Sequence, residues 1–259
     1  MLDSSPPRAG IPDAAEEVRF GARAVLAGVA IALVAVPFGL LLLMVQSRWS
    51  PLVRIDDGAR DALYAIAVDE AAFVTALKLI SIIGSAAVYV PLFAVLAAWL
   101  AWRRLGRLAV FVVVTMLGSW LLNSLVKLAV DRARPVLPDP VAHAGGMSFP
   151  SGHAQSATVA AAVLLLVFLP ALNGRPGRRR IAVAAALVWV VVVAFSRVGL
   201  GVHYVSDVLA GAVLGAAWVS ATTALFSVSR RQRGQPPVEP SQGLEPEHAA
   251  RLGAGEPPR

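Results

Sequence analysis

The chain has 259 residues, of which 57% are hydrophobic and only 15% are charged, and several apolar runs are long enough to cross a bilayer. This composition indicates an integral membrane protein and excludes a soluble one. The net charge of +7 does not indicate nucleic-acid binding, because the basic residues gather in short segments between apolar runs, as they do in cytoplasmic loops. The absence of cysteine excludes a disulfide framework, a thiolate nucleophile and a cysteine-ligated metal.

The N-terminal part begins with a polar segment and leads into a first membrane span. Residues 1–20 are rich in proline, alanine and charge, which predicts a disordered tail. The apolar run from Val25 to Val45 is too long for a signal-peptide core, so we expect a retained first span. Residues 50–83 mix charges with apolar residues at helical spacing, which predicts one or two amphipathic helices on the membrane surface or packed over the bundle. The alternative for this segment is a solvated loop with a short helix.

Five further spans are predicted between polar loops, over Ser85–Trp102, Leu108–Val126, His153–Leu172, Ile181–Phe195 and His203–Phe226. The fold class is therefore all-α: a polytopic membrane bundle of six transmembrane helices, with amphipathic helices after the first span. The membrane domain covers residues 21–228. Residues 229–259 are rich in proline, glutamate and glycine, and we expect a second disordered tail there.

The distribution of arginine predicts the orientation of this bundle. Basic segments at residues 103–107, 175–180 and 230–233 follow the second, fourth and sixth spans, and these three positions share one side of the membrane. By the positive-inside tendency that side is cytoplasmic, together with both termini. We therefore expect a multi-pass protein of the cell membrane. The loops after the third and fifth spans, which hold the unusual polar residues, then converge on the extracytoplasmic side.

The first of these polar stretches follows the third span and contains Lys127 and Arg134-Pro135. A lysine at a helix end commonly snorkels toward the interface, and Asp-Arg-Ala-Arg can be an ordinary solvated loop. A phosphate monoester, however, carries close to two negative charges, and an arginine fork can bind two of its oxygens. A cluster of fixed cations at this position therefore suits a phosphate group.

The second stretch, Phe149-Pro150-Ser151-Gly152-His153, opens the fourth span. Pro150 and Ser151 occupy positions where a helix is capped, and free amides at a helix start form an anion site. Gly152 has no side chain and allows close backbone approach. His153 projects from the same place and could protonate a leaving alkoxide as a general acid. The alternative is that Ser151 is only a cap and His153 only an interfacial residue.

The third stretch contains Arg197, His203 and Asp207. If a helix starts near His203, Asp207 shares its face, and the carboxylate can hold the imidazole in one tautomer. A histidine held in this way beside an arginine is a plausible nucleophile for a phosphoryl group. The alternative is a structural ion pair that joins membrane helices. Gly199 and Gly201 predict a tight loop that folds Arg197 back towards His203.

Together these stretches resemble the type 2 phosphatidic acid phosphatase superfamily, which includes membrane lipid phosphatases and is related to vanadium haloperoxidases. Its motifs are a lysine separated by six residues from Arg-Pro, a Pro-Ser-Gly-His, and a Ser-Arg followed after five residues by histidine and after three more by aspartate. This sequence matches every motif position, with Lys127 to Arg134-Pro135, Pro150 to His153, and Ser196-Arg197 to His203 and Asp207. The resemblance covers about residues 85–226.

The resemblance implies a metal-independent phosphatase that hydrolyses a phosphomonoester or diphosphate of an amphiphilic lipid. His203 would attack phosphorus and form a phosphohistidine, Asp207 would orient His203, and His153 would protonate the leaving group and then activate water. The residues that would bind the phosphoryl oxygens are Lys127, Arg134, Ser151, Gly152 and Arg197. Undecaprenyl diphosphate is the leading substrate for a bacterial protein, with phosphatidylglycerol phosphate and phosphatidic acid as alternatives.

No cluster of carboxylates lies near the motifs in the sequence, so we expect no metal and no other cofactor. The expected partners are the lipid phosphate substrate and the bilayer, without nucleic acid. Three other functions remain open. They are a phosphotransferase that uses an acceptor other than water, a vanadate-dependent haloperoxidase and a transporter. The lipid-embedded layout argues against the haloperoxidase, whose relatives are soluble, and the position of the charges at one face argues against the transporter.

Overall fold

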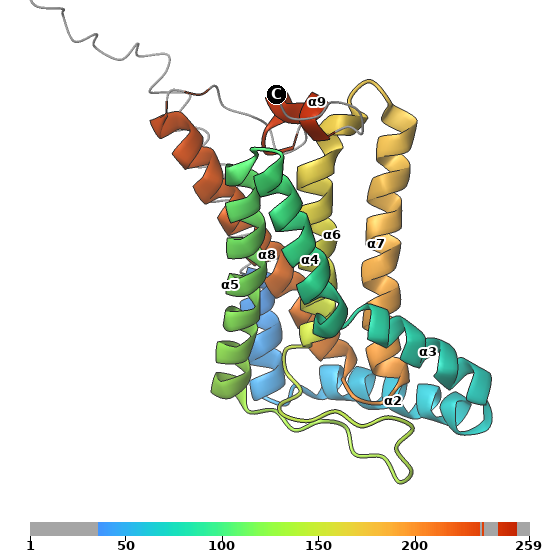
Figure 1. Cartoon of the computed structure of the whole chain (residues 1–259). Helices are drawn as coiled ribbons and strands as arrows, with labels where there is room; N and C mark the ends of the chain where they lie inside the picture. Colours follow the sequence, from blue (N-terminus) through green and yellow to red (C-terminus); the bar gives the residue numbers. More distant parts are fainter. Residues whose placement is uncertain (1–35, 234, 236–242, 253–259) are drawn as a thin grey trace, which may run out of the picture.

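The computed structural model describes residues 36–233, 235 and 243–252, and in these residues the only regular elements are helices (Figure 1). A first helix, Val36–Gln46, is followed by the long helices and by short elements near the C-terminus. The long helices are α2 (Ser50–Asp69), α3 (Ala71–Ile83), α4 (Ala86–Trp102), α5 (Gly106–Val130), α6 (Gly152–Phe168), α7 (Pro176–Gly199) and α8 (Val205–Gln232). The short elements are two 3-10 helices, Leu169–Leu172 and Pro246–His248, and α9 (Ala249–Leu252). The predicted all-α membrane fold is confirmed.

Five helical segments in the described residues are long and apolar enough to cross a membrane, namely Ala71–Trp102, Gly106–Val130, Gly152–Leu172, Pro176–Gly199 and Val205–Arg230. A sixth is counted if Val36–Gln46 and α2, which meet at an angle of 85°, form one broken span. Each of the five later predicted spans corresponds to one of the helices α4 to α8. The predicted first span, Val25–Val45, and the predicted tail 1–20 lie partly or wholly outside the described residues.

The amphipathic segment after the first span forms two helices, α2 and α3. Helix α2 crosses the lower end of the bundle in Figure 1 and packs against α7 and α8, and α3 packs against α4 and α7. The buried face of α2 includes Leu52 and Ala67, and the buried face of α3 includes Val74 and Leu77. These two helices therefore cover the end of the bundle that holds the three polar stretches.

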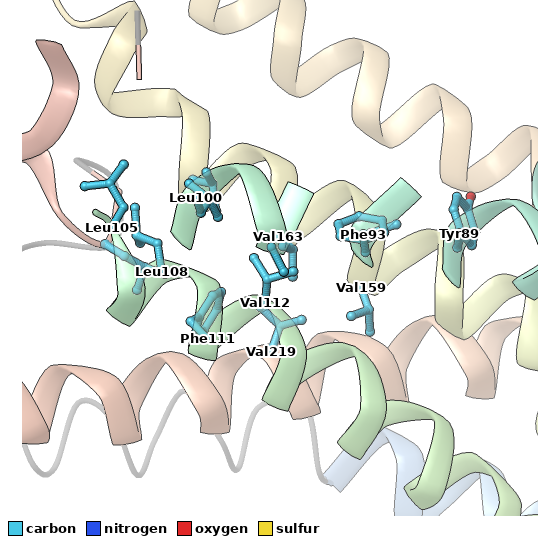
Figure 2. Packing of buried hydrophobic residues seen from close by; sticks show 14 of the residues in the cluster. Tyr89, Phe93, Leu100, Leu105, Leu108, Phe111, Val112, Val159, Val163 and Val219 are labelled. Atoms are coloured by element: carbon cyan, nitrogen blue, oxygen red, sulfur yellow. The ribbon is translucent and has the colours of Figure 1, made fainter. Parts of the chain in front are cut away.

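The apolar core lies between α4, α5, α6 and α8 (Figure 2). Leu100 of α4, Phe111 and Val112 of α5 and Val163 of α6 have no exposed surface. In a bilayer the neighbouring lipid is as apolar as these side chains, so close packing and small residues bring the helices together. Helix α6, which is rich in alanine, contacts α4, α5, α7 and α8 and is the centre of the bundle.

Two glycines of α8 allow it to pack closely against α6. A Cβ atom at Gly211 would lie 2.4 Å from the carbonyl oxygen of Ser151, and one at Gly215 would lie 2.9 Å from that of Gln155. Such contacts are closer than any larger residue allows without moving a backbone. At the end of this interface the backbone amide of Ser151 donates to the carbonyl oxygen of Asp207 at 2.9 Å. The starts of α6 and α8 are thus joined directly.

The bundle has one basic end and one end that carries the motifs (Figure 1). The basic turns between α4 and α5 and between α6 and α7, and the end of α8, lie at the upper end. The end of α5, the loop 131–150, the start of α6 and the α7–α8 turn lie at the lower end. The stretches expected to converge therefore share one end, while the side of the membrane that this end faces remains a prediction.

Residues 243–252 differ from the disordered tail that the composition of residues 229–259 predicts. Helix α8 continues to Gln232, and the segment after the undescribed residues 236–242 packs against the basic end of the bundle. Leu244 and Leu252 are buried in the apolar core, and Glu247 pairs with Arg230 at 2.5 Å. This segment packs through its two leucines and through ion pairs with nearby arginines. The average composition of residues 229–259, which is rich in proline and glycine, does not reveal these contacts.

Candidate active site

His203 and Asp207 form the centre of the lower end. His203 precedes α8, and its Nδ1 lies 3.3 Å from Oδ2 of Asp207. The same oxygen accepts the backbone N–H of Tyr204 at 2.9 Å and a hydrogen bond from the hydroxyl of Ser148. An ionised carboxylate can only accept hydrogen bonds, so the imidazole nitrogen that faces it must carry the proton. We therefore assign the proton of His203 to Nδ1, which donates to Asp207. The lone pair of His203 is then on Nε2, which accepts a hydrogen bond from Nη1 of Arg134.

Burial lowers the pKa of His203 to about 4, with Asp207 opposing the shift and Arg134 and Arg197 adding to it. The ring is only 3% exposed, so a charge on it would lose its hydration. His203 is therefore neutral at pH 7. Neutrality is the state that a nitrogen nucleophile requires.

The lowered pKa of His203 predicts a pH dependence of stability. The unfolded chain protonates this ring near 6.5 and the folded chain near 4, so the unfolded state binds more protons between these values. The stabilisation from neutral His203 is complete above pH 6.5 and is lost as the pH falls toward 4, by on the order of 3 kcal/mol. Thermal unfolding in detergent from pH 7.5 to 4.5 should show the wild type losing more stability than His203→Gln. A constant difference between the two proteins would contradict this.

Arg134 and Lys127 are held beside this histidine by backbone carbonyl groups. Nη1 of Arg134 lies 3.1 Å from Nε2 of His203 and donates to the carbonyl oxygen of Val202 at 2.7 Å. The other nitrogens of Arg134 donate to the carbonyl oxygens of residues 145–147, and Nζ of Lys127 donates to that of residue 147 at 2.6 Å. Because neutral carbonyls do not cancel their charges, both cations remain available to an anion.

Arg197 reaches the site from the last turn of α7. The structure places it inside this helix, which continues to Gly199, and the tight turn follows at Gly201, whose φ is +67°. Arg197 is 7% exposed, and its Nη1 donates to the hydroxyl of Ser81 in α3. Its Nε is buried and has no hydrogen-bond partner in the described part of the chain. A buried donor without a partner costs free energy of folding, so this N–H is suited to donate a hydrogen bond to an oxygen of a bound ligand.

The start of α6 brings Ser151, Gly152 and His153 to the same place. Ser151 has the N-cap position, but its hydroxyl makes no capping bond and is buried without a partner among the described residues. A side chain at Gly152 would approach Asn123 within 3.3 Å. His153, the second residue of α6, lies near Arg197 and His203. All eight residues that the motifs indicate thus lie at one end of the bundle.

Two further charged residues, Asp56 and Arg132, contact this centre and were given no role by the sequence. Nη1 of Arg132 donates to Oδ1 of Asp207 at 2.6 Å, and Nη2 donates to Oδ2 of Asp56 at 2.9 Å. Asp56 belongs to α2 and is 1% exposed. One signal was present, because Asp56 follows the buried Leu52 by four positions and so lies on the apolar stripe of an amphipathic helix.

No group of three or more histidine, aspartate or glutamate side chains in residues 36–233, 235 and 243–252 is placed to hold a metal ion. The site instead gathers cations, namely Lys127, Arg134 and Arg197, around a buried histidine. This charge pattern suits an anionic group with several oxygens.

Residues 108–231 match the family model described as the PAP2 superfamily. These residues make up just under half of the chain, and they are similar to the PAP2 superfamily. All three motifs lie within the matched PAP2 segment, whereas α2 and α3 lie before it.

Two curated relatives are phosphatases by name. The chain is 31% identical over 133 residues to phosphatidylglycerophosphatase B of Bacillus subtilis (strain 168), which covers 51% of this chain and 65% of the relative. It is 35% identical over 120 residues to lipid A 1-phosphatase of Rhizobium johnstonii, which covers 43% of this chain and 44% of the relative. The chain thus spans less than two thirds of the length of either protein.

A solved structure has the same fold. The crystal structure of a transmembrane PAP2-type phosphatidylglycerolphosphate phosphatase from Bacillus subtilis superimposes with a TM-score of 0.66 at 24% sequence identity. The match covers 76% of this chain and 95% of that one. The two proteins therefore share a fold, and the spans described above are those of a multi-pass membrane protein.

Proposed function

We propose that this protein is a membrane lipid phosphatase that hydrolyses a phosphomonoester or diphosphate of an amphiphilic lipid through a phosphohistidine. The observation that carries the proposal is the neutral, buried His203, whose Nδ1 faces Asp207 while its Nε2 faces Arg134 at 3.1 Å. The names of the two curated relatives, one acting on phosphatidylglycerophosphate and one on lipid A, support a lipid phosphate as substrate.

In the proposed reaction, Nε2 of His203 attacks phosphorus while the bond from phosphorus to the leaving oxygen breaks. His153 gives its proton to that oxygen, so the lipid leaves as a neutral alcohol or as a lower phosphate. His153 then takes a proton from water, which attacks the phosphohistidine, breaks the nitrogen–phosphorus bond and releases phosphate. Asp207 accepts the Nδ1–H of His203 throughout and stabilises the positive charge that the ring carries in the intermediate.

The phosphoryl oxygens would bind to groups with unused hydrogen-bonding capacity. Nε of Arg197 and the hydroxyl of Ser151 are both buried and unpaired in the described residues, and the amide of Gly152 is at the start of α6. Arg134 and Lys127 add two cations, which would stabilise the charge that spreads over the oxygens in the transition state. These residues supply by electrostatics what a metal ion supplies in other phosphatases.

The position of the site favours an amphiphilic substrate. It lies at one end of a bundle whose outer helix surfaces are apolar, so the tails of a lipid can stay in the bilayer while its phosphate reaches His203. The basic turns at the opposite end support our proposal that the site faces the extracytoplasmic side, because basic loops tend to be cytoplasmic. Undecaprenyl diphosphate remains our leading substrate, and phosphatidylglycerol phosphate and phosphatidic acid are the alternatives.

Phosphate release by detergent-purified protein tests the function, the substrate and the absence of a metal requirement. We expect release from at least one lipid of a panel that contains undecaprenyl diphosphate, phosphatidylglycerol phosphate, lipid A and phosphatidic acid. The rate should be unchanged in excess EDTA, because cationic side chains do the work of a metal. Activity that EDTA removes and magnesium restores would contradict the mechanism. No release from any lipid would contradict the proposed function.

A further inference from the structure

We propose that Asp56, which lies on α2 and before the PAP2 segment, is a positioning residue for the nucleophile and acts through Arg132 on Asp207 and His203. This inference rests on the proposed phosphatase function. Helix α2, which crosses the end of the bundle, would then take part in the reaction.

Asp56 is a buried carboxylate whose hydrogen-bond partners all lie near the site. Its Oδ1 accepts the backbone N–H of Ser206 at 2.9 Å, and its Oδ2 accepts the hydroxyl of Ser206 at 2.5 Å and Nη2 of Arg132 at 2.9 Å. Ser206 stands directly before Asp207 in the first turn of α8. Asp56 thus fixes both the backbone and the cation next to the residue that holds the nucleophile.

A buried ion pair usually adds little net stability, because removing the charges from water costs about as much as their attraction returns. An apolar residue at position 56 would leave the backbone N–H of Ser206 and one arm of Arg132 without the partner that they have in the structure. The hydrogen bonds of Asp56 therefore indicate a role in orienting these two residues.

Arg132 connects the two carboxylates as a rigid fork. Its Nη1 donates to Oδ1 of Asp207 at 2.6 Å and to the hydroxyl of Ser206 at 2.7 Å, while Nη2 binds Asp56. The guanidinium plane lies over the ring of Tyr204 at 4.2 Å. With its Oδ1 occupied by Arg132, Asp207 presents Oδ2 to Nδ1 of His203. Removal of Asp56 would free one arm of the fork and let this carboxylate turn.

Asp56 also balances the charge behind the nucleophile. Asp56, Arg132 and Asp207 together carry one net negative charge, which matches the single positive charge that His203 gains when it is phosphorylated. Without Asp56 the group is neutral, and the charge of Arg132 opposes that of the imidazolium. The contribution is specific to the reacting state, so it should appear in kcat and not in KM.

The test compares Asp56→Asn with Asp57→Asn on the best substrate of the wild type. Asparagine keeps the shape and removes the charge, and Asp57, the next residue, pairs with Arg60 at 2.8 Å near the surface. We expect kcat of Asp56→Asn to fall roughly tenfold or more, the effect of losing an outer partner of an oriented histidine, with KM within about twofold of wild type. Asp57→Asn should keep both constants within about twofold.

The pH profile of kcat separates positioning from a merely structural role. The charged or titratable groups facing His203 are Asp207 of α8, Arg134 of the loop, Arg197 of α7 and His153 of α6, and all are retained in Asp56→Asn. Loss of a negative charge makes the ring harder to protonate, so the acid limb of kcat should move to lower pH. A variant that is only less stable would lower the rate at every pH and leave the limb in place.

A double-mutant cycle tests whether Arg132 transmits the effect. The substitution Asp56→Asn should lower kcat when it is made in the wild-type background. It should have no further effect when it is added to the Arg132→Gln variant. If Asp56→Asn does not purify as folded protein, Arg132→Lys replaces it, because lysine keeps the charge but cannot form the fork, and it should lose kcat at unchanged KM. The inference would be overturned if Asp56→Asn kept the wild-type kcat and acid limb. It would also be overturned if the two substitutions had independent effects in the cycle, or if Arg132→Lys had wild-type kinetics. Phosphate release by the wild type, measured alongside, shows whether the proposed function itself stands.

Discussion

Replacing His203 by alanine should reduce phosphate release by at least about a thousandfold, because no other group can form the covalent intermediate. The folded protein should remain, because the buried His203 is neutral and alanine therefore removes no charge, and Asp207 keeps its ion pair with Arg132. Initial rates on the preferred lipid, with size-exclusion profiles and melting temperatures of both proteins, measure this. Acid-labile, base-stable phosphate on the wild-type chain should also be absent from the variant.

His143 provides the matched control. It lies in the same loop as Arg134, is exposed and is outside the three motifs, so His143→Ala should keep a rate within about twofold of wild type. A His203→Ala protein with near-normal turnover would exclude the covalent scheme. A large loss in His143→Ala would show that the loop contributes to the reaction in another way.

Replacing Asp207 by asparagine should lower kcat by about a thousandfold and also destabilise the protein. The carboxylate is surrounded by four donors, from Arg132, Ser148, Tyr204 and His203. An amide has only one acceptor atom, so its NH₂ group must face a donor, and either Arg132 loses its partner or the imidazole turns to the other tautomer. The comparable change in a Ser-His-Asp hydrolase costs about 10⁴-fold.

Kinetics and thermal unfolding of the same preparation measure the two effects of this change. Asp139→Asn is the control. Asp139 is an exposed aspartate in the loop 131–150, and within the described residues only its backbone amide is hydrogen-bonded, to the hydroxyl of Tyr64 at 3.1 Å. The melting temperature of Asp207→Asn should fall by several degrees, as expected for a lost buried hydrogen bond to a charged group, and that of Asp139→Asn should not change. Full activity in Asp207→Asn would remove Asp207 from the mechanism.

The sequence predicts much of the bundle because a membrane span has a fixed length and charged residues mark its ends. The same regularity explains why residues as distant as Lys127 and His203 could be assigned to one end: alternating spans return the chain to each side in turn. The prediction of spans was least accurate where a charge lies inside a helix. Arg197 lies inside α7, and its guanidinium is bound by Ser81 of a different helix, a contact that the local sequence does not reveal.

The roles of Asp56 and of residues 243–252 depend on contacts between distant parts of the chain. Asp56 reaches Ser206 across 150 positions, and Leu244 donates its amide to the carbonyl of Leu166 at 3.2 Å. A local sequence pattern cannot distinguish an aspartate that will be buried from one that will be exposed. The difference depends on which distant residue the aspartate contacts, and a single sequence does not reveal which segments will meet.

The alternation of helix directions has an electrical consequence at the lower end. There α6 and α8 begin, so the positive ends of their dipoles face the site, whereas α5 and α7 finish there with the negative ends of theirs. The last turns of α5 and α7 carry Lys127 and Arg197, respectively. Each of these cations therefore covers a partial negative charge that would otherwise repel an incoming anion. The loss of either cation removes its positive charge and leaves the partial negative charge of that helix end uncompensated beside the site.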